Sequence, residues 1–128
     1  MLDKISLWNK KQLEIAKIYS KKLTKKIKLP IYNLKISNPT FHQFIIRTQL
    51  RDKLKNYLEK NNIETAIHYP IPIHKQLAYK KQFGNLSLPN TEKFSKEILS
   101  LPINPHMKKS EVNFVIRKVN EFFKIKKK

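Results

Sequence analysis

The segment Ile67-His-Tyr-Pro-Ile-Pro-Ile-His74 concentrates the side chains of this chain that could do chemistry. It places an imidazole beside a phenol, at His68 and Tyr69, and a second imidazole at His74. Imidazole changes its protonation near neutral pH, and a phenol both donates and accepts hydrogen bonds. Each proline fixes φ at about −65° and favours an extended conformation in the residue before it. The sequence therefore predicts a stiff, extended segment, here named the His-Tyr rod (residues 67–74), that holds His68 and Tyr69 in a fixed direction.

No self-contained reaction centre can be assembled around the rod from the sequence. Glu64 is the only carboxylate near His68 and His74, and two prolines separate the histidines, so no metal site is predicted. The chain has no Gly-x-Ser-x-Gly turn, and its single glycine excludes a glycine-rich phosphate loop. Spacing alone leaves open whether His68 faces a ligand or is a buried histidine with its hydrogen bonds satisfied. His42 and His106 are interpreted as structural or exposed.

The periodicity of apolar residues predicts alternating helices and strands joined by short connections. Helical spacing predicts a helix over residues 1–26, on which Trp8 either packs or contacts a partner, and a last helix capped by Ser110. Three strands are predicted, over residues 31–37, 41–48 and 63–67, and an extended segment over 101–105. The other predicted helices are one that has Asp52 in its first turn and Leu50 in its buried stripe and ends at Asn61-Asn62, a short one over 75–82, and one capped by Asn90 or Thr91 that carries Phe94, Ile98 and Leu99. This order predicts one α/β domain, built as an α+β sandwich.

Composition limits the environment of the protein. A chain of 128 residues fits one domain, and the absence of cysteine excludes disulfides and thiolate metal sites. No apolar run reaches the roughly 20 residues of a membrane span, and residues 1–12 lack the core of a signal peptide. A cytoplasmic location is expected.

The formal net charge of +19 raises an alternative function, a basic module that binds nucleic acid or other polyanions. Arginine, the residue preferred for phosphate and base recognition, occurs only at Arg47, Arg51 and Arg117. Lysines run along the whole chain, with a denser group at Lys124 and residues 126–128. Together with the many Ile and Asn residues, this favours a solvated lysine-rich surface and a coding bias toward AT-rich codons.

The rod belongs to a longer run, Asn62-Ile-Glu-Thr-Ala-Ile-His-Tyr-Pro-Ile-Pro-Ile-His-Lys-Gln-Leu-Ala-Tyr79, which closely resembles the C-terminal domain of the DegT/DnrJ/StrS family. These are pyridoxal-phosphate-dependent aminotransferases that act on nucleotide-linked keto sugars. The resemblance extends to residues 2–19, which are similar to the interdomain helix of the family, and to residues 41–58 and 99–105. Asn62 stands where relatives usually have glycine, and asparagine can serve the same helix cap.

The resemblance implies the small domain of a fold-type I aminotransferase, with a small, mainly antiparallel sheet covered by helices. Residues 1–26 would form the interdomain helix and residues 31–128 the substrate domain. His68 and Tyr69, and more weakly His74, would contact the sugar. The pyridoxal phosphate, its lysine and its other ligands would belong to a large N-terminal domain outside this sequence, so no catalytic residue is predicted in the chain.

The resemblance also implies an amino donor as second substrate and a homodimer, and the composition predicts no membrane contact. By this interpretation the chain is part of an enzyme, from a truncated or split gene, and is inactive alone. A third hypothesis is a degenerate fragment without function.

Overall fold

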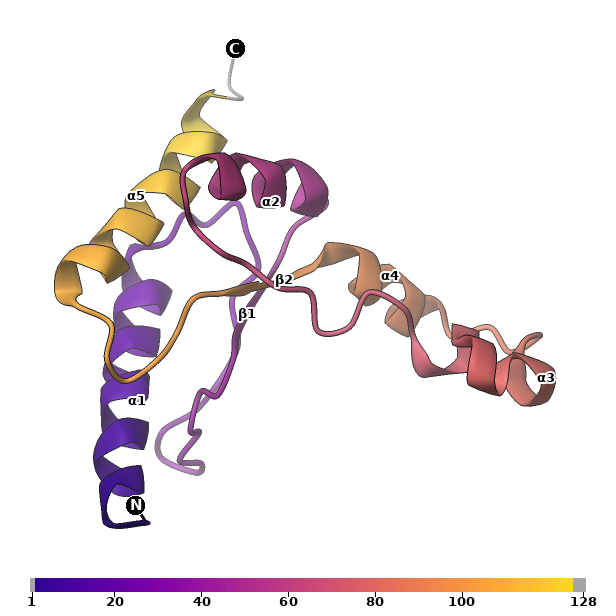
Figure 1. Ribbon diagram of the computed structural model, residues 1–128, viewed down its shortest axis with the longest axis horizontal. Coiled ribbons are helices and arrows are strands. Elements are labelled where there is room, and N and C mark those ends of the chain that lie inside the picture. Colours follow the sequence, from indigo (N-terminus) through magenta and orange to yellow (C-terminus); the bar gives the residue numbers. More distant parts are fainter. Residues whose placement is uncertain (1, 126–128) are drawn as a thin grey trace.

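The computed structural model describes residues 2–125 of the chain (Figure 1). The helices and strands in chain order are η1 Leu2–Lys4, α1 Ile5–Lys22, β1 Phe44–Arg47, α2 Arg51–Lys60, η2 Ile73–Lys75, η3 Leu77–Tyr79, α3 Lys80–Phe83, α4 Pro89–Glu97, β2 Ile98–Leu101 and α5 Lys109–Ile125. Helices α1, α2 and α5 gather around the strands, whereas α3 and α4 extend away from them on one side.

The sheet pairs β1 with β2 in antiparallel register, from Phe44 opposite Leu101 to Arg47 opposite Ile98. Single bridges extend this ladder on both sides, between Lys28 and Arg47 and between Ala66 and Ser100. The prediction of a small antiparallel sheet covered by helices is therefore confirmed.

One face of the sheet carries the core. Side chains alternate along a strand, so Phe44 and Ile46 of β1 share a face with Leu99 and Leu101 of β2, and all four are buried. On this face the ring of Phe44 lies 5.1 Å from that of Tyr19 in α1. The Tyr19 hydroxyl donates a hydrogen bond of 2.7 Å to the carbonyl of Pro102, and burial raises the pKa of this phenol. Tyr19 thus remains a neutral donor at the centre of the core.

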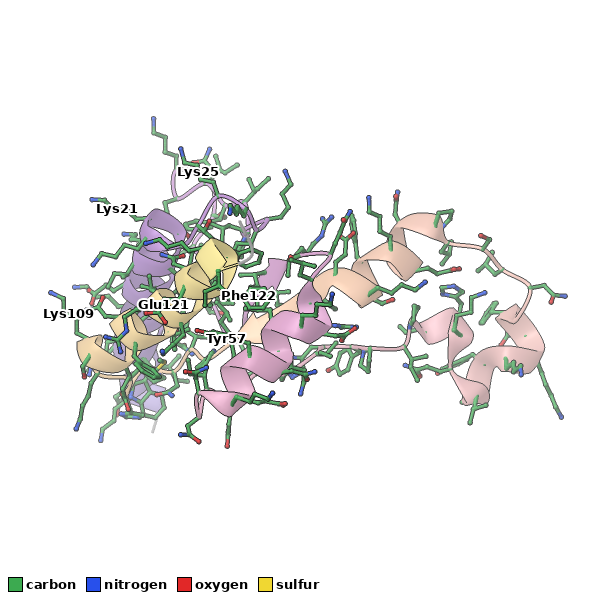
Figure 2. The ribbon with its side chains drawn as sticks, turned by 90° about the horizontal axis from the view of Figure 1, so that it is seen from above. Lys21, Lys25, Tyr57, Lys109, Glu121 and Phe122 are labelled. Carbon is green, nitrogen blue, oxygen red and sulfur yellow. The ribbon has the colours of Figure 1, made fainter. Side chains whose placement is uncertain are left out.

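The last helix packs against both α1 and α2. Figure 2 shows Tyr57 of α2 beside Phe122 of α5, with ring centroids 5.4 Å apart. The Tyr57 hydroxyl also donates to Glu121 Oε2 at 3.4 Å. The predicted apolar face of α5 is confirmed, because its members are all buried: Val112, Val115, Ile116, Val119, Phe122 and Phe123.

Two helix boundaries differ from the prediction. In each case a side-chain oxygen accepts a backbone N–H near the end of the helix. α1 stops at Lys22 instead of residue 26, where the Asn120 side chain of α5 accepts the backbone N–H of Thr24 at 2.8 Å. Ser110 does not cap α5, since the helix begins at Lys109 and Glu111 Oε2 accepts the N–H of Lys108 at 2.6 Å.

The predicted strand over residues 31–37 is wrong. Asn33 makes a turn there, since its side chain accepts the N–H of Lys35 at 2.9 Å and its carbonyl accepts that of Ile36 at 3.1 Å. Ile36 is 83% exposed. The alternating apolar residues of this segment therefore face no sheet.

Three further predictions need correction around the strands. Ile98 and Leu99 belong to β2 and not to the preceding helix, which ends at Glu97. Residues 63–67 contribute only the Ala66 bridge instead of a full strand. The helix over 75–82 is broken into η2, η3 and α3.

Residues 69–97 form an arm, named here for its position beyond the sheet (Figure 1). Many large apolar side chains of the arm are exposed, among them those of Ile73, Leu77 and Leu86. Within the described part of the chain, no helix has the length and apolar character needed to cross a membrane.

Candidate functional site

His68 is held beside β2 by a backbone bridge and a side-chain hydrogen bond. Ala66 and Ser100 exchange backbone hydrogen bonds of 2.8 and 3.3 Å, which fix the start of the His-Tyr rod against the strand. Two residues further on, His68 Nδ1 lies 2.9 Å from the hydroxyl of the buried Ser100. This contact fixes the orientation of the half-buried imidazole and leaves Nε2 as the ring atom available to a ligand.

A hollow of about 360 Å³ opens next to this pair. Its polar wall combines two imidazoles, a carboxylate, a hydroxyl and two amides, and these come from His42, Gln43, Glu64, His68, Ser100 and Asn104. Thr65 also lines the hollow, and its buried hydroxyl has no hydrogen-bond partner among the described residues. A larger hollow of about 630 Å³ adjoins the first across Glu64 and Asn104. This arrangement suits a ligand with several hydroxyl groups, because it offers both donors and acceptors.

The side chain of Tyr69 does not line the hollow of His68. It is 71% exposed, and its ring meets that of His68 edge-on, with centroids 5.7 Å apart. Tyr69 therefore stays a predicted contact that only a ligand extending beyond the hollow would reach.

His74 lies apart from His68 and already has a partner. Its side chain is 5% exposed, and Nε2 lies 3.0 Å from Glu92 Oε1 in α4. Glu92 Oε1 also accepts the backbone N–H of Leu88 at 3.1 Å and lies 3.6 Å from Lys75 Nζ. The structure thus gives His74 a place in the arm, where it joins the end of the rod to α4, and its predicted contact with a sugar remains a prediction.

The stability of the arm should depend on pH through Glu92. Hydrogen bonds from His74 and from the Leu88 N–H, together with the charge of Lys75, lower the pKa of Glu92 below its ordinary value of 4.5. A carboxyl whose pKa is lower in the folded state contributes stability above its ordinary pKa and loses it as the pH falls through the folded-state value. Glu92→Gln should therefore remove part of the acid-side fall in the thermal unfolding temperature below pH 4.5. The role of Glu92 would be contradicted if the unfolding temperatures of the wild-type protein and Glu92→Gln fell by the same amount as the pH is lowered.

Sequence reasoning missed Ser100 and His42 as members of the site. Ser100 stands inside the apolar run Ile98–Leu101, and a lone polar residue in a buried strand is the one signal that could have identified it. His42 precedes β1 and reaches the hollow only through the pairing of the two strands, which no local pattern encodes.

The residues around His68 do not fit pyridoxal phosphate by themselves. The described residues that line the hollow include no lysine to hold an aldehyde and no lysine or arginine to pair with a phosphate. Neither is any group of three His, Cys, Asp or Glu side chains among residues 2–125 arranged to hold a metal ion. The hollow is suited to the uncharged part of a ligand.

Comparison with known proteins gives a consistent match. The chain is 35% identical to the dTDP-3-amino-3,4,6-trideoxy-alpha-D-glucose transaminase of Streptomyces venezuelae, over 94% of the chain and 32% of that enzyme. It is 37% identical to the dTDP-3-amino-3,6-dideoxy-alpha-D-galactopyranose transaminase of Aneurinibacillus thermoaerophilus, over 89% of the chain and 31% of that enzyme. The chain therefore spans about a third of the length of the curated relatives it matches.

Solved structures agree with the sequence matches. The S. venezuelae enzyme DesV superposes with a TM-score of 0.88 at 35% identity, over 94% of this chain and 33% of DesV. NtdA from Bacillus subtilis, solved with the cofactor PMP, gives a TM-score of 0.81 at 27% identity, over 93% of this chain and 29% of NtdA. Residues 1–120 match the family of DegT/DnrJ/EryC1/StrS aminotransferases, and the prediction from the rod and its flanking segments is confirmed. The chain belongs to the DegT/DnrJ/EryC1/StrS aminotransferase family.

Proposed function

We propose that this chain is the C-terminal, substrate-facing part of a pyridoxal-phosphate-dependent aminotransferase that transfers an amino group to a nucleotide-linked keto sugar. The observation that carries the proposal is the His68–Ser100 pair, which presents an oriented imidazole to a hydroxyl-suited hollow in a member of this family. The relatives that match over nearly the whole chain are sugar transaminases by name.

In this proposal the chain binds and orients, and the reacting groups come from elsewhere. His68 Nε2 donates to or accepts from a sugar hydroxyl, and Ser100 fixes the tautomer through Nδ1. Tyr69 contacts the exposed end of the same substrate. The cofactor, when bound, supplies the electron sink for amino transfer, and a large N-terminal domain supplies its lysine.

The proposal also covers organisation and location. In this proposal α1, Ile5–Lys22, is the interdomain helix, and residues 31–128 belong to the substrate domain of an enzyme that works as a homodimer in the cytoplasm. The sequence contains no cysteine, so the fold needs no disulfide, which agrees with the reducing conditions of the cytoplasm.

A comparison of the chain alone with the chain in a complete enzyme would test this proposal. The purified chain should develop no visible absorption band with pyridoxal phosphate and should not transaminate a keto sugar. Joined to the large domain of the S. venezuelae relative, it should do both. Transamination by residues 1–128 alone, or a folded and cofactor-loaded fusion without activity, would contradict the proposal.

The distribution of lysines bears on the alternative of a general polyanion-binding module. Exposed lysines occur on α1, α2, α4 and α5, and Figure 2 shows Lys21, Lys25 and Lys109 pointing outward from the helical part. The predicted dense run at residues 126–128 lies outside the described residues. A spread over so many elements supports a solvated surface.

A further inference from the structure

One small region departs from this even spread of charge. A hollow of about 460 Å³ lies where β1 ends and α2 begins, and four cationic side chains line it from three parts of the chain: Lys26, Lys28, Arg47 and Lys93. Glu97 is the only carboxylate among the described lining residues. The formal charges of these four cations and one carboxylate sum to +3.

The fold builds this cluster through backbone pairing. Lys28 and Arg47 exchange backbone hydrogen bonds of 2.9 Å each, so they lie directly opposite each other and their side chains share one face. That face is opposite to the core, because the neighbouring residue Ile46 points into the core. Two cations are thus fixed side by side by the ladder and not by chance surface proximity.

Arg47 is also held in a defined orientation. Its guanidinium lies 3.5 Å from the ring centroid of Phe94, and its Nη2 donates to Glu97 Oε2 at 3.1 Å. Because Glu97 is paired with Arg47, no described lining carboxylate is left to pair with the lysines. Lys28 and Lys93 have no ion-pair partner among the described residues, and Lys26 Nζ makes one hydrogen bond, of 2.7 Å, to the carbonyl of Phe123. Their remaining ammonium protons are available to an anion.

We infer that this basic hollow is a binding site for a diphosphate group. Lys28 and Lys93 are the primary contacts, Arg47 and Lys26 supply further positive charge, and the exposed Gln49 between β1 and α2 supplies an amide. A diphosphate matches the site because it carries several charges within a few ångströms, as the four cations do. Such a group comes either free or as part of a nucleoside diphosphate, and the inference holds for binding alone, whatever reaction the complete enzyme performs.

The same strand face connects this hollow with the His68 site. Arg47 lies opposite Ile98 and Ser100 lies opposite Ile45, so Arg47 and Ser100 are diagonal neighbours about 7–8 Å apart. A ligand that filled both hollows would place its hydroxyl-rich part at His68 and its charged part at Arg47.

Titration of the ¹⁵N-labelled chain with inorganic diphosphate at low salt would test the inference. We expect saturable binding, with amide shifts confined to residues 26–28, 47–50 and 93. The double variant Lys28→Ala/Lys93→Ala should bind about tenfold more weakly, since two exposed ion pairs are lost. Glu97→Gln should bind about threefold more tightly, because it removes the competing carboxylate from Arg47.

A matched variant separates the site from general charge. Lys10→Ala/Lys17→Ala removes the same charge from exposed positions of α1 and should change the affinity less than twofold. Circular dichroism would check that all variants are folded. Equal weakening by both double variants, or shifts spread over lysines of the whole surface, would overturn the inference.

The same titration with thymidine 5′-diphosphate and with a short DNA duplex distinguishes sources. Tighter binding of the nucleotide with the same set of shifts would assign the hollow to a nucleoside diphosphate, and equal binding would assign it to diphosphate itself. Preferential binding of the duplex, with a steep dependence on salt that Lys28→Ala/Lys93→Ala leaves unchanged, would overturn the inference in favour of a nucleic-acid surface.

Discussion

Phe44→Ala is expected to lower the free energy of unfolding by about 3–5 kcal/mol, as large-to-small substitutions of buried aromatics do. Phe44 has no exposed surface and lies in β1, opposite Leu101 and in ring contact with Tyr19 and Phe41. Its truncation would open a cavity between the sheet and α1. Chemical denaturation of the two proteins, followed by far-ultraviolet circular dichroism, measures the difference.

Phe83→Ala provides the control for this substitution. Phe83 ends α3 in the arm, where it is partly exposed and outside the core cluster. Its loss should cost less than about 1 kcal/mol. If Phe44→Ala does not fold, Phe44→Leu should still unfold at a lower denaturant concentration than Phe83→Ala. A smaller effect at residue 44 than at residue 83 would mean that the sheet does not organise the core.

His68→Ala, in the complete enzyme, is expected to lower kcat/KM for the keto-sugar substrate about tenfold. The loss of one oriented hydrogen bond to a substrate corresponds to about 1.4 kcal/mol. His68 is half-buried and outside the core cluster, so the free energy of unfolding should change less than the free energy of the transition state. Steady-state kinetics and denaturation on the same samples give both quantities.

Two variants sharpen this prediction. Ser100→Ala keeps the imidazole but removes the hydroxyl 2.9 Å from Nδ1, so it should cost about threefold in kcat/KM and change the ¹⁵N tautomer signature of His68. Lys60→Ala removes an exposed side chain of α2 that lines neither this hollow nor the adjoining larger one, and activity should be unchanged. Unchanged kinetics in His68→Ala would remove the proposed role of this residue.

The parts of the fold that could be predicted are those in which local pattern and tertiary packing agree. The apolar period of residues 112–123 matches a helix and is buried as one. Asn62 was predicted to cap α2, and it adopts a φ of 58°, in the left-handed region that a helix end requires. The errors arise where tertiary pairing overrides the pattern, since Phe94 and Ile98 have helical spacing but Ile98 pairs with Arg47 in the sheet.

The site could be predicted only in part for the same reason. His68 was found because its neighbours are unusual in the chain, and the hollow beside it supports a ligand contact. Ser100 lies 32 positions away in sequence and meets His68 only because β2 carries the Ala66 bridge. Lys28 and Arg47 are likewise neighbours through a bridge between distant segments. Side chains that meet through long-range pairing leave no periodic signal.

The Ala66–Ser100 bridge also determines how much the length and sequence of the arm can vary without loss of the fold. Residues 67–97 leave the sheet after Ala66 and return to it in β2, where Ser100 pairs with Ala66, so the two ends of this segment stay together whatever its sequence. The entropy of closing such a loop grows only slowly with its length, by about 0.6 kcal/mol for each doubling. Insertions, deletions or a complete exchange of the segment between His74 and Glu92 would therefore leave the core and the anchoring of Ala66 to Ser100 in place. The segment between His74 and Glu92 is therefore the part of the domain whose length and sequence can change while the sheet that carries it stays the same.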